Sequence, residues 1–278
     1  MSETNGTQHL FDQAIALCGE PDKRRAKVSP AYQNMVGPFG GITAAKILHA
    51  ILKHPEREGS PISLTVNYLG PINSDEVEIE VVLLRANRSN QHWSVALKQG
   101  SEIQCSATCV FAKRKDTWQS QEASCPETPR YEDVTCLPEL PGFPVWVKQY
   151  DMRFVSGAPF EKIESGAEGD DKDLSESLLW IADKPARKLD FASLASIADA
   201  FFPRFIIRRR KLAPLGTVSL TVHFHATEEE LEKLESGFVL GHARASKFGG
   251  SYFDQTAELW SEDKKLLATT SQMVYYKD

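Results

Sequence analysis

The sequence predicts an α+β fold made of two repeats, each a central helix wrapped by a curved antiparallel sheet. Three observations predict it: one helix followed by four strands occurs twice, a proline-rich stretch separates the two occurrences, and short sequence matches fall at corresponding places. Together they indicate duplication of one structural unit. The 278 residues, 41% of them hydrophobic, suffice for a large core without disulfide bonds.

The first repeat is expected to begin with a helix. Gly40 and Gly41 open it, apolar residues recur at helical spacing over residues 42–53, and Pro55 and Gly59 end it. Runs that alternate apolar and polar residues then predict strands. The four expected strands of this repeat are residues 62–69, 77–84, 92–98 and 103–111.

The second repeat has the same plan. A helix is expected over residues 191–202, and Pro203 ends it because proline cannot continue a helix. The segment SLTV occurs at residues 63–66 and again at 219–222, in the first expected strand of each repeat. Two such units can pair their edge strands into one sheet and bury their helices between them. The four expected strands of this repeat are residues 217–225, 238–246, 252–260 and 266–276.

The domain boundaries follow from a break in periodicity. Residues 1–115 form the expected N-terminal unit, residues 116–144 a linker and residues 145–278 the C-terminal unit. The linker is rich in proline and has little periodicity. A second polar stretch, residues 164–173, is expected to be an exposed loop.

Charge and hydropathy limit the classes of partner. A net charge of −6 disfavours nonspecific nucleic-acid binding, which needs an excess of Lys and Arg. No apolar run is long enough to span a membrane, residues 1–8 lack a signal core, and residues 275–278 (YYKD) are not a peroxisomal tripeptide. We therefore expect a cytoplasmic protein without a nucleic-acid or membrane partner.

Cysteines and histidines indicate neither disulfides nor a metal. The five cysteines are odd in number and include no CxxC pair, so we expect reduced thiols, with Cys105 and Cys109 on one face of a strand in the core. His223 and His225 could bind a metal, but no third ligand accompanies them, so ordinary hydrogen bonds are favoured. No nucleotide-binding fingerprint occurs, and no cofactor is expected.

Three short stretches carry a family resemblance. They are residues 37–41 (GPFGG), residues 195–199 (ASIAD) and residues 268–272 (ATTSQ). With the order of elements, they make the chain, from about residue 26 to its end, resemble the double-hotdog acyl-CoA thioesterases of the TesB-like group. This resemblance implies that the chain hydrolyses the thioester of an acyl-CoA, or of a carrier-bound acyl group, to a free acid and a thiol.

The resemblance also implies the catalytic residues, Asp199, Thr217 and Gln272. The family has a Thr or Ser at the start of the strand after the second helix, and Thr217 is the expected match. Ser219 and Thr221 remain alternatives, because simple alternation would point all three side chains to one face.

Asp199 is the most informative of these residues. Apolar side chains surround it in the expected helix, and burial of an unpaired carboxylate is unfavourable. The Asp then either lies on an exposed or hydrogen-bonded helix face, or serves as a general base. As a base it would activate a water that Thr217 and Gln272 position, while Gly40 and Gly41 would bind the substrate oxyanion at a helix N-terminus.

The first repeat is expected to lack a working copy of this site. Alignment of the repeats by sequence matches Asp199 with Ile47, Thr217 with Pro61 and Gln272 with Thr108, and none of the first-half residues can replace its counterpart. One site per chain is the prediction. Because duplication supplies the pairing within one chain, we expect a monomer or a loose homo-oligomer.

The basic run at residues 208–211 (RRRK) is either a solvated surface or a contact for the phosphates of coenzyme A.

Two other functions stay open at this point. A dehydratase or acyl transferase of the same fold could act on a carrier-bound intermediate, but hydratases of this fold usually need an Asp–His pair near a helix start. His49 is the first-half helix histidine, and no Asp accompanies it. A non-catalytic acyl-binding protein would be favoured if Asp199 were exposed and remote from Gln272.

Overall fold

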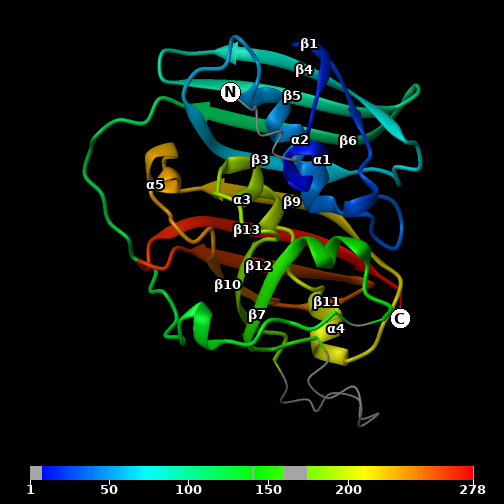
Figure 1. Cartoon of the computed structure of the whole chain (residues 1–278). Helices are drawn as coiled ribbons and strands as arrows, with labels where there is room; N and C mark the ends of the chain where they lie inside the picture. The colour runs from blue at the N-terminus through cyan, green and yellow to red at the C-terminus, as the bar shows by residue number, and fades with distance from the viewer. Residues whose placement is uncertain (1–7, 140, 160–173, 278) are drawn as a thin grey trace, which may run out of the picture.

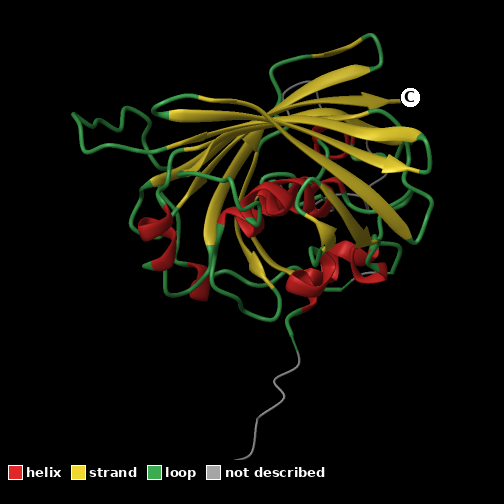
Figure 2. Ribbon diagram, turned by 90° about the horizontal axis from the view of Figure 1, so that it is seen from above, coloured by secondary structure: helices red, strands yellow, loops and turns green. Residues whose placement is uncertain are grey.

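The computed structural model describes residues 8–139, 141–159 and 174–277. Its strands form one 13-stranded antiparallel sheet, which curves around the two central helices on one of its faces (Figures 1 and 2). The predicted architecture of two repeats, each a central helix against an antiparallel sheet, is confirmed, and each half contains strands beyond the expected four. The loop expected at residues 164–173 lies outside the described residues.

The N-terminal half contains the central helix α2, Gly40–Leu52, which is buried on nearly all sides. A short helix and two strands precede α2 and were not predicted: α1 (Leu10–Ala14), β1 (Cys18–Glu20) and β2 (Lys23–Lys27). The four expected strands follow: β3 (Ser60–Tyr68), β4 (Glu76–Ala86), β5 (Asn90–Gln99) and β6 (Glu102–Ala112). Both Cys105 and Cys109 are buried in β6, as expected.

The C-terminal half repeats this order. Two strands, β7 (Tyr150–Ser156) and β8 (Ser177–Asp183), precede the central helix α3, Phe191–Ile197. The remaining elements are α4 (Arg204–Arg209), β9 (Leu215–Phe224), α5 (Glu228–Glu232), β10 (Val239–Arg244), β11 (Phe248–Gly249), β12 (Tyr252–Trp260) and β13 (Leu266–Tyr276). Among the helices that the structure describes, none has the length and apolarity needed to cross a membrane.

The two halves meet where β3 pairs with β9. The strand order is β1-β2-β4-β5-β6-β3 in one half and β9-β13-β12-β10-β8-β7 in the other, so the second order reverses the first (Figure 1). Thr65 lies directly opposite Thr221, and their hydroxyl oxygens are 3.0 Å apart. The repeated SLTV segments therefore face each other at the centre of the sheet, as expected if the halves pair edge strands.

A β-bulge occurs at the same place in both halves. In β3, Pro61 lies opposite Phe111 and Ser63 opposite Val110, which leaves Ile62 as the extra residue. In β9, Thr217 lies opposite Val274 and Ser219 opposite Met273, which leaves Val218 as the extra residue. A bulge reverses the alternation of side chains along its strand. Bulges at equivalent positions of β3 and β9 therefore support duplication of one structural unit.

The second central helix is shorter than predicted. Helix α3 ends at Ile197 rather than Phe202, and Asp199 lies in the turn that follows instead of in mid-helix. The N–H of Asp199 donates to the Ser196 carbonyl, three residues back, at 3.2 Å. This tighter turn ends the regular helix before Pro203 and directs the Asp199 side chain out of it.

Part of the proline-rich segment, residues 123–134, lies against the outer face of the C-terminal sheet. The indole N–H of Trp180 donates to the Pro129 carbonyl at 2.9 Å, and the Tyr131 ring stacks on Phe238 with centroids 4.3 Å apart. Trp260 is fully buried in the same apolar cluster. The segment therefore covers aromatic residues that the outer face of the sheet would otherwise expose to water.

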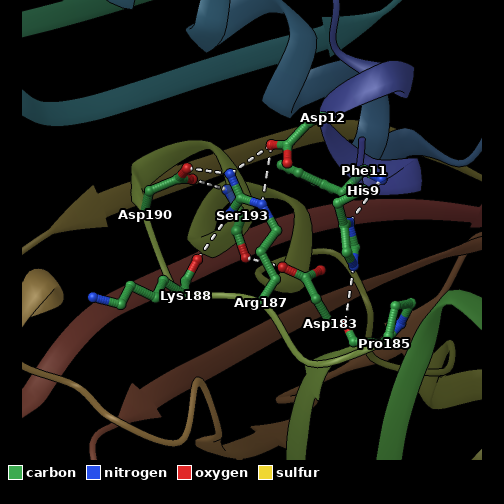
Figure 3. Close-up of polar contacts among 9 residues, drawn as sticks. All are labelled: His9, Phe11, Asp12, Asp183, Pro185, Arg187, Lys188, Asp190 and Ser193. Carbon is green, nitrogen blue, oxygen red and sulfur yellow. Dashed lines mark hydrogen bonds and ion pairs between the residues drawn. The ribbon is translucent and has the colours of Figure 1, made fainter. Parts of the chain in front are cut away.

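An arginine connects the N-terminal helix α1 to the start of α3 (Figure 3). Arg187 donates to the Asp12 carboxylate from Nε and Nη2, at 3.0 and 2.7 Å, and also bonds Asp190. Asp190 in turn caps α3 by accepting from the Ser193 N–H at 2.8 Å. The Ser193 hydroxyl donates to the buried Asp183 carboxylate at 2.6 Å. One network thus holds segments of both halves together.

Replacement of Arg187 with Ala should lower the free energy of unfolding by about 1–3 kcal/mol, because two carboxylates lose a largely buried partner. Urea denaturation measures this change. Arg130→Ala is the matched control, since Arg130 also bonds two carboxylates but is exposed to solvent. The control should leave the denaturation midpoint unchanged; equal shifts in the two variants would contradict a special role for Arg187.

Candidate active site

The two central helices run antiparallel, and a glycine allows them to touch. A Cβ on Gly41, at the start of α2, would lie 2.4 Å from the Ser196 carbonyl oxygen near the end of α3. At the other end of α2, His49 lies near Asp190, the N-cap of α3. Burial lowers the His49 pKa, and the charge of Asp190 opposes that fall. The N-terminus of α2 therefore meets the turn that carries Asp199.

Asp199 is buried at this meeting point, with 8% of its surface exposed. The backbone N–H of Gly41 and the side chain of Gln272 both hydrogen-bond its carboxylate. Burial raises the Asp199 pKa to about 7, and the two hydrogen bonds oppose that rise. A carboxyl group with a pKa near neutrality can accept a proton and release it again under ordinary conditions.

Gln272 points inward from β13, as its expected role requires. Its side chain is 6% exposed, and its Nε2 donates to the Ala198 carbonyl at 3.4 Å. Its cross-strand neighbours are Leu220 in β9 and Gln255 in β12, both buried. The structure therefore brings Asp199 and Gln272, which are far apart in sequence, into contact.

The bulge in β9 separates Thr217 from the two alternatives. Thr217 lies opposite Val274, which is buried, and is itself half-buried. Ser219 lies opposite the exposed Met273, and Thr221 shares that outer face. The expectation that all three side chains share one face was wrong, because Val218 is an extra residue that reverses the alternation. Thr217 alone of the three is on the face that carries Gln272.

Gly40 and Gly41 lie against the predicted base. A Cβ on Gly40 would be 2.6 Å from Oδ2 of Asp199, so a larger residue would displace the carboxylate. The Gly41 N–H, expected to face a substrate oxyanion, is hydrogen-bonded to Asp199 instead. The helix N-terminus has the expected preference for negative charge, but the charge it contacts here belongs to the protein.

Tyr68, at the end of β3, is a site residue that the sequence did not reveal. Its hydroxyl donates to the Gly40 carbonyl at 2.9 Å. Burial raises its pKa well above the usual value, and the neighbouring Asp199 and Cys105 raise it further, so the phenol stays protonated. An aromatic residue that ends a strand carries no local signal of such a contact, since only the fold brings β3 to the start of α2.

The sequence singled out two further groups of residues, His223 with His225 and the basic run at residues 208–211. His225 hydrogen-bonds the Thr269 hydroxyl at 3.1 Å, the ordinary contact expected for it. Arg208 and Arg209 form the last turn of α4, and Arg210 caps that helix with φ at 52°. A contact between this basic run and coenzyme A stays a prediction.

Sequence comparison assigns most of the chain to two domains of one family. Residues 29–112 match the acyl-CoA thioesterase N-terminal domain, and residues 122–276 match the acyl-CoA thioesterase C-terminal domain. The chain belongs to the acyl-CoA thioesterase family. A sequence search of curated proteins found no match.

Solved structures support the fold of this acyl-CoA thioesterase family member. A conserved protein of unknown function with a hot dog fold, from Alicyclobacillus acidocaldarius, is 40% identical, with a TM-score of 0.91 over 98% of this chain and 99% of the other. A putative thioesterase II from Thermobifida fusca is 18% identical, with a TM-score of 0.82 over 98% and 99%. A tesB protein from Mycobacterium avium is 17% identical, with a TM-score of 0.73 over 98% and 100%. The fold is a double hotdog.

Strand register corrects one match between the halves of this acyl-CoA thioesterase family member. Gln272 lies opposite Leu220, and the equivalent Leu64 lies opposite Cys109. The first-half counterpart of Gln272 is therefore Cys109, not Thr108, because the sequence alignment of the two strands was one residue out. The match between Thr217 and Pro61 is confirmed, since each precedes the bulged residue of its strand.

Proposed function

We propose that this chain hydrolyses an acyl thioester, carried by coenzyme A or by a carrier protein, to a free acid and a thiol. The observation that supports the proposal is the state of Asp199. Its carboxylate is buried between the halves, has a pKa of about 7, and bonds Gln272 of its own half and Gly41 of the other. Membership in a thioesterase family and a buried carboxyl group with a pKa near neutrality both favour hydrolysis of a thioester.

In the proposed mechanism Asp199 is the general base. It accepts a proton from a water as the water oxygen attacks the thioester carbonyl carbon. Gln272 and Thr217 orient this water, since an amide and a hydroxyl each offer a donor and an acceptor. The tetrahedral intermediate then collapses, the carbon–sulfur bond breaks, and the thiolate takes the proton from Asp199. One water is consumed, and acid and thiol leave.

Binding of the substrate oxyanion at Gly40 and Gly41 stays a prediction. The Gly41 N–H contacts Asp199, and in this proposal the peptide holds the base. Convergence of Asp199, Thr217 and Gln272 on one shared water is likewise part of the proposal. Of the three, Asp199 and Gln272 hydrogen-bond each other, and Thr217 shares the inner face of the sheet with Gln272.

Hydrolysis fits the site better than the alternative functions do. A non-catalytic binding protein was to be favoured by an exposed Asp199 remote from Gln272, whereas Asp199 is buried and bonded to it. A dehydratase would need a histidine beside the acid. His49 lies more than two turns along α2 from Gly40, at the end of the helix near Asp190.

A panel of acyl-CoA substrates of different chain length and branching, with detection of the released thiol, tests the proposal. The same acyl groups on a carrier protein form a second arm, which distinguishes the two thiol carriers. Thiol release that depends on Asp199 supports hydrolysis. Absence of release from every member of both arms by the folded protein would remove the proposed function.

Removal of either water-positioning side chain should reduce turnover less than loss of the base does. We expect Gln272→Ala and Thr217→Ala to lower kcat/KM by roughly ten- to a hundredfold each, the effect of one hydrogen bond to a charged or reacting group. Neither effect should add to that of Asp199→Asn, since all three residues act on one water. Ser219→Ala is the matched control on the outer face and should keep full turnover. Equal losses in Ser219→Ala and Thr217→Ala would contradict the assignment of Thr217.

A further inference from the structure

One peptide group, between Gly40 and Gly41, is held from both sides. Its carbonyl oxygen, on Gly40, accepts the hydrogen bond of the Tyr68 hydroxyl at 2.9 Å. Its N–H, on Gly41, faces the Asp199 carboxylate, whose Oδ2 lies 2.6 Å from the position of a Cβ on Gly40, and a hydrogen bond from this N–H lowers the Asp199 pKa. Strand β3 of the N-terminal half, the first turn of α2 and the turn after α3 therefore meet through a single amide.

We propose that Tyr68 is a positioning residue for Asp199, acting through the Gly40–Gly41 peptide. It touches neither the reacting water nor the thioester carbonyl in this role. The phenol O–H fixes the orientation of the peptide and polarises it, and the polarised N–H is the better donor to the carboxylate. The residue comes from the half of the chain that lacks its own Asp, Thr and Gln set.

The sign of the effect of Tyr68 on the Asp199 pKa follows from the strength of the hydrogen bonds in this chain. Hydrogen bonds in a chain strengthen one another, by about 10–30% per bond in condensed-phase estimates. A bond to a charged carboxylate is stronger than one between neutral groups, so the Gly41–Asp199 bond gains most from the chain. A stronger donor stabilises the ionised carboxylate and opposes the effect of burial. The Tyr68 hydroxyl should therefore help to keep Asp199 ionised at neutral pH.

Tyr68 and Asp199 can both approach this peptide because residue 40 is a glycine. A Cβ there would lie 2.6 Å from Oδ2 of Asp199 and 3.3 Å from the Tyr68 hydroxyl oxygen. Both polar groups thus approach the same point from different elements. Any side chain at position 40 would push at least one of them out of place.

Among the described residues, the titratable groups that interact with the charge of Asp199 are two protonated phenols. Tyr68 faces it from β3 and Tyr150 from the start of β7, and burial raises the pKa of both phenols well above the usual value. Cys105, in β6, is near Tyr68 and also keeps its proton, with a pKa raised to about 12 by burial. Arg204, on α4, donates to Gln255, which pairs with Gln272 across the sheet. A change in the titration of Asp199 can therefore be attributed to its hydrogen bonds.

The test is a direct titration of Asp199 by NMR in protein labelled with ¹³C at the aspartate carboxyl carbon. Asp199→Asn identifies the signal by its loss. We expect Tyr68→Phe to raise the Asp199 pKa by a few tenths of a unit to about one unit, in line with a weakened bond to a charged group. Incorporation of 3-fluorotyrosine at position 68, a more acidic phenol and a stronger donor, should move the Asp199 pKa in the opposite direction.

Tyr150→Phe is the matched control. It removes a buried phenol hydroxyl that also lies near Asp199, but this hydroxyl bonds the Ser196 hydroxyl at 2.7 Å and not the peptide that holds the carboxylate. The Asp199 pKa should change less in this variant than in Tyr68→Phe. An unchanged pKa in Tyr68→Phe, or equal shifts in the two variants, would overturn the inference.

The kinetic readout rests on the proposed hydrolase function, whereas the titration does not. In Tyr68→Phe the acid limb of kcat/KM should move to higher pH by the same amount as the Asp199 pKa, with the plateau largely recovered at high pH. A plateau that falls at every pH, without movement of the limb, would assign Tyr68 to contact with the substrate and overturn the positioning role. If the wild type released no thiol at all, the proposed function would fail while the titration still decided the role of Tyr68.

Discussion

Replacement of Asp199 with Asn is expected to lower turnover by roughly a hundred- to ten-thousandfold, the usual contribution of a general base. Asn keeps the shape of the side chain and can still accept from the Gly41 N–H, but it cannot take a proton from water. In the wild type, kcat/KM should rise with pH up to about 7, where Asp199 becomes ionised. Thiol release measured between pH 5 and pH 9 checks both expectations.

The same substitution should stabilise the protein in alkaline solution. The folded state holds the Asp199 proton up to about pH 7, whereas an ordinary Asp loses it near 3.8. Between these values the folded state binds more protons than the unfolded state, so wild-type stability falls as pH rises through this window. The difference corresponds to at most roughly 4 kcal/mol. Asp199→Asn should therefore exceed the wild type in unfolding free energy at pH 8 and lose this advantage towards pH 4.

Asp183→Asn is the control for the effect of Asp199→Asn on turnover. Asp183 is a second buried acid, with a pKa raised to about 6 by burial, and it bonds Ser193 at the opposite end of α3 from Asp199. Its replacement should leave turnover near the wild-type level. Near wild-type hydrolysis by Asp199→Asn of every acyl-CoA that the protein accepts would show that the proposed mechanism is wrong.

Gly41→Ala is expected to affect both stability and turnover. The new Cβ would lie 2.4 Å from the Ser196 carbonyl oxygen and 2.5 Å from the Phe39 ring, and a backbone oxygen cannot move aside as a flexible side chain can. Overpacking of this kind costs typically about 1–3 kcal/mol, and more where backbone must shift. Because the contact joins α2 to the segment that carries Asp199, separation of the helices should also lower kcat.

Gly249→Ala is the matched control for this substitution. A Cβ at Gly249 would meet no atom within 4 Å, and it should leave the urea midpoint and kcat unchanged. Unchanged stability and kcat in Gly41→Ala would refute a close contact between the helices.

Hydrophobic periodicity predicted eight strands because most of these strands have one face in the core and one towards solvent. Apolar residues at helical spacing also predicted both central helices, although these helices are buried on nearly all sides. Periodicity missed β8, Ser177–Asp183, in which nearly every residue is buried. Residues 123–134 cover the outer face of this strand, so the alternation that marks a half-exposed strand is lost. It also missed β2, Lys23–Lys27, a strand with four basic residues and one buried alanine.

The three expected site residues came from the family resemblance, and only one of them also conflicts with its surroundings in the sequence. Asp199 among apolar residues is such a conflict, and it led to the buried carboxylate. Thr217 could not be chosen by alternation, because a bulge is a property of the paired strands and has no mark in one of them. Tyr68 and the Gly40–Gly41 peptide were out of reach for a similar reason, since their contact depends on how two halves of the chain pack.

The repeated bulge has a consequence for how the two halves could diverge. Two identical chains in a homodimer carry every substitution twice, so a residue cannot serve catalysis in one copy and packing in the other. Within one chain, Pro61 and Cys109 occupy the places of Thr217 and Gln272 without any change to the latter. The covalent connection also gives the halves a high effective concentration for each other, independent of how dilute the protein is. Fusion therefore lets one half keep the catalytic residues while the other half adapts to packing, whereas a symmetric dimer must meet both demands with one sequence.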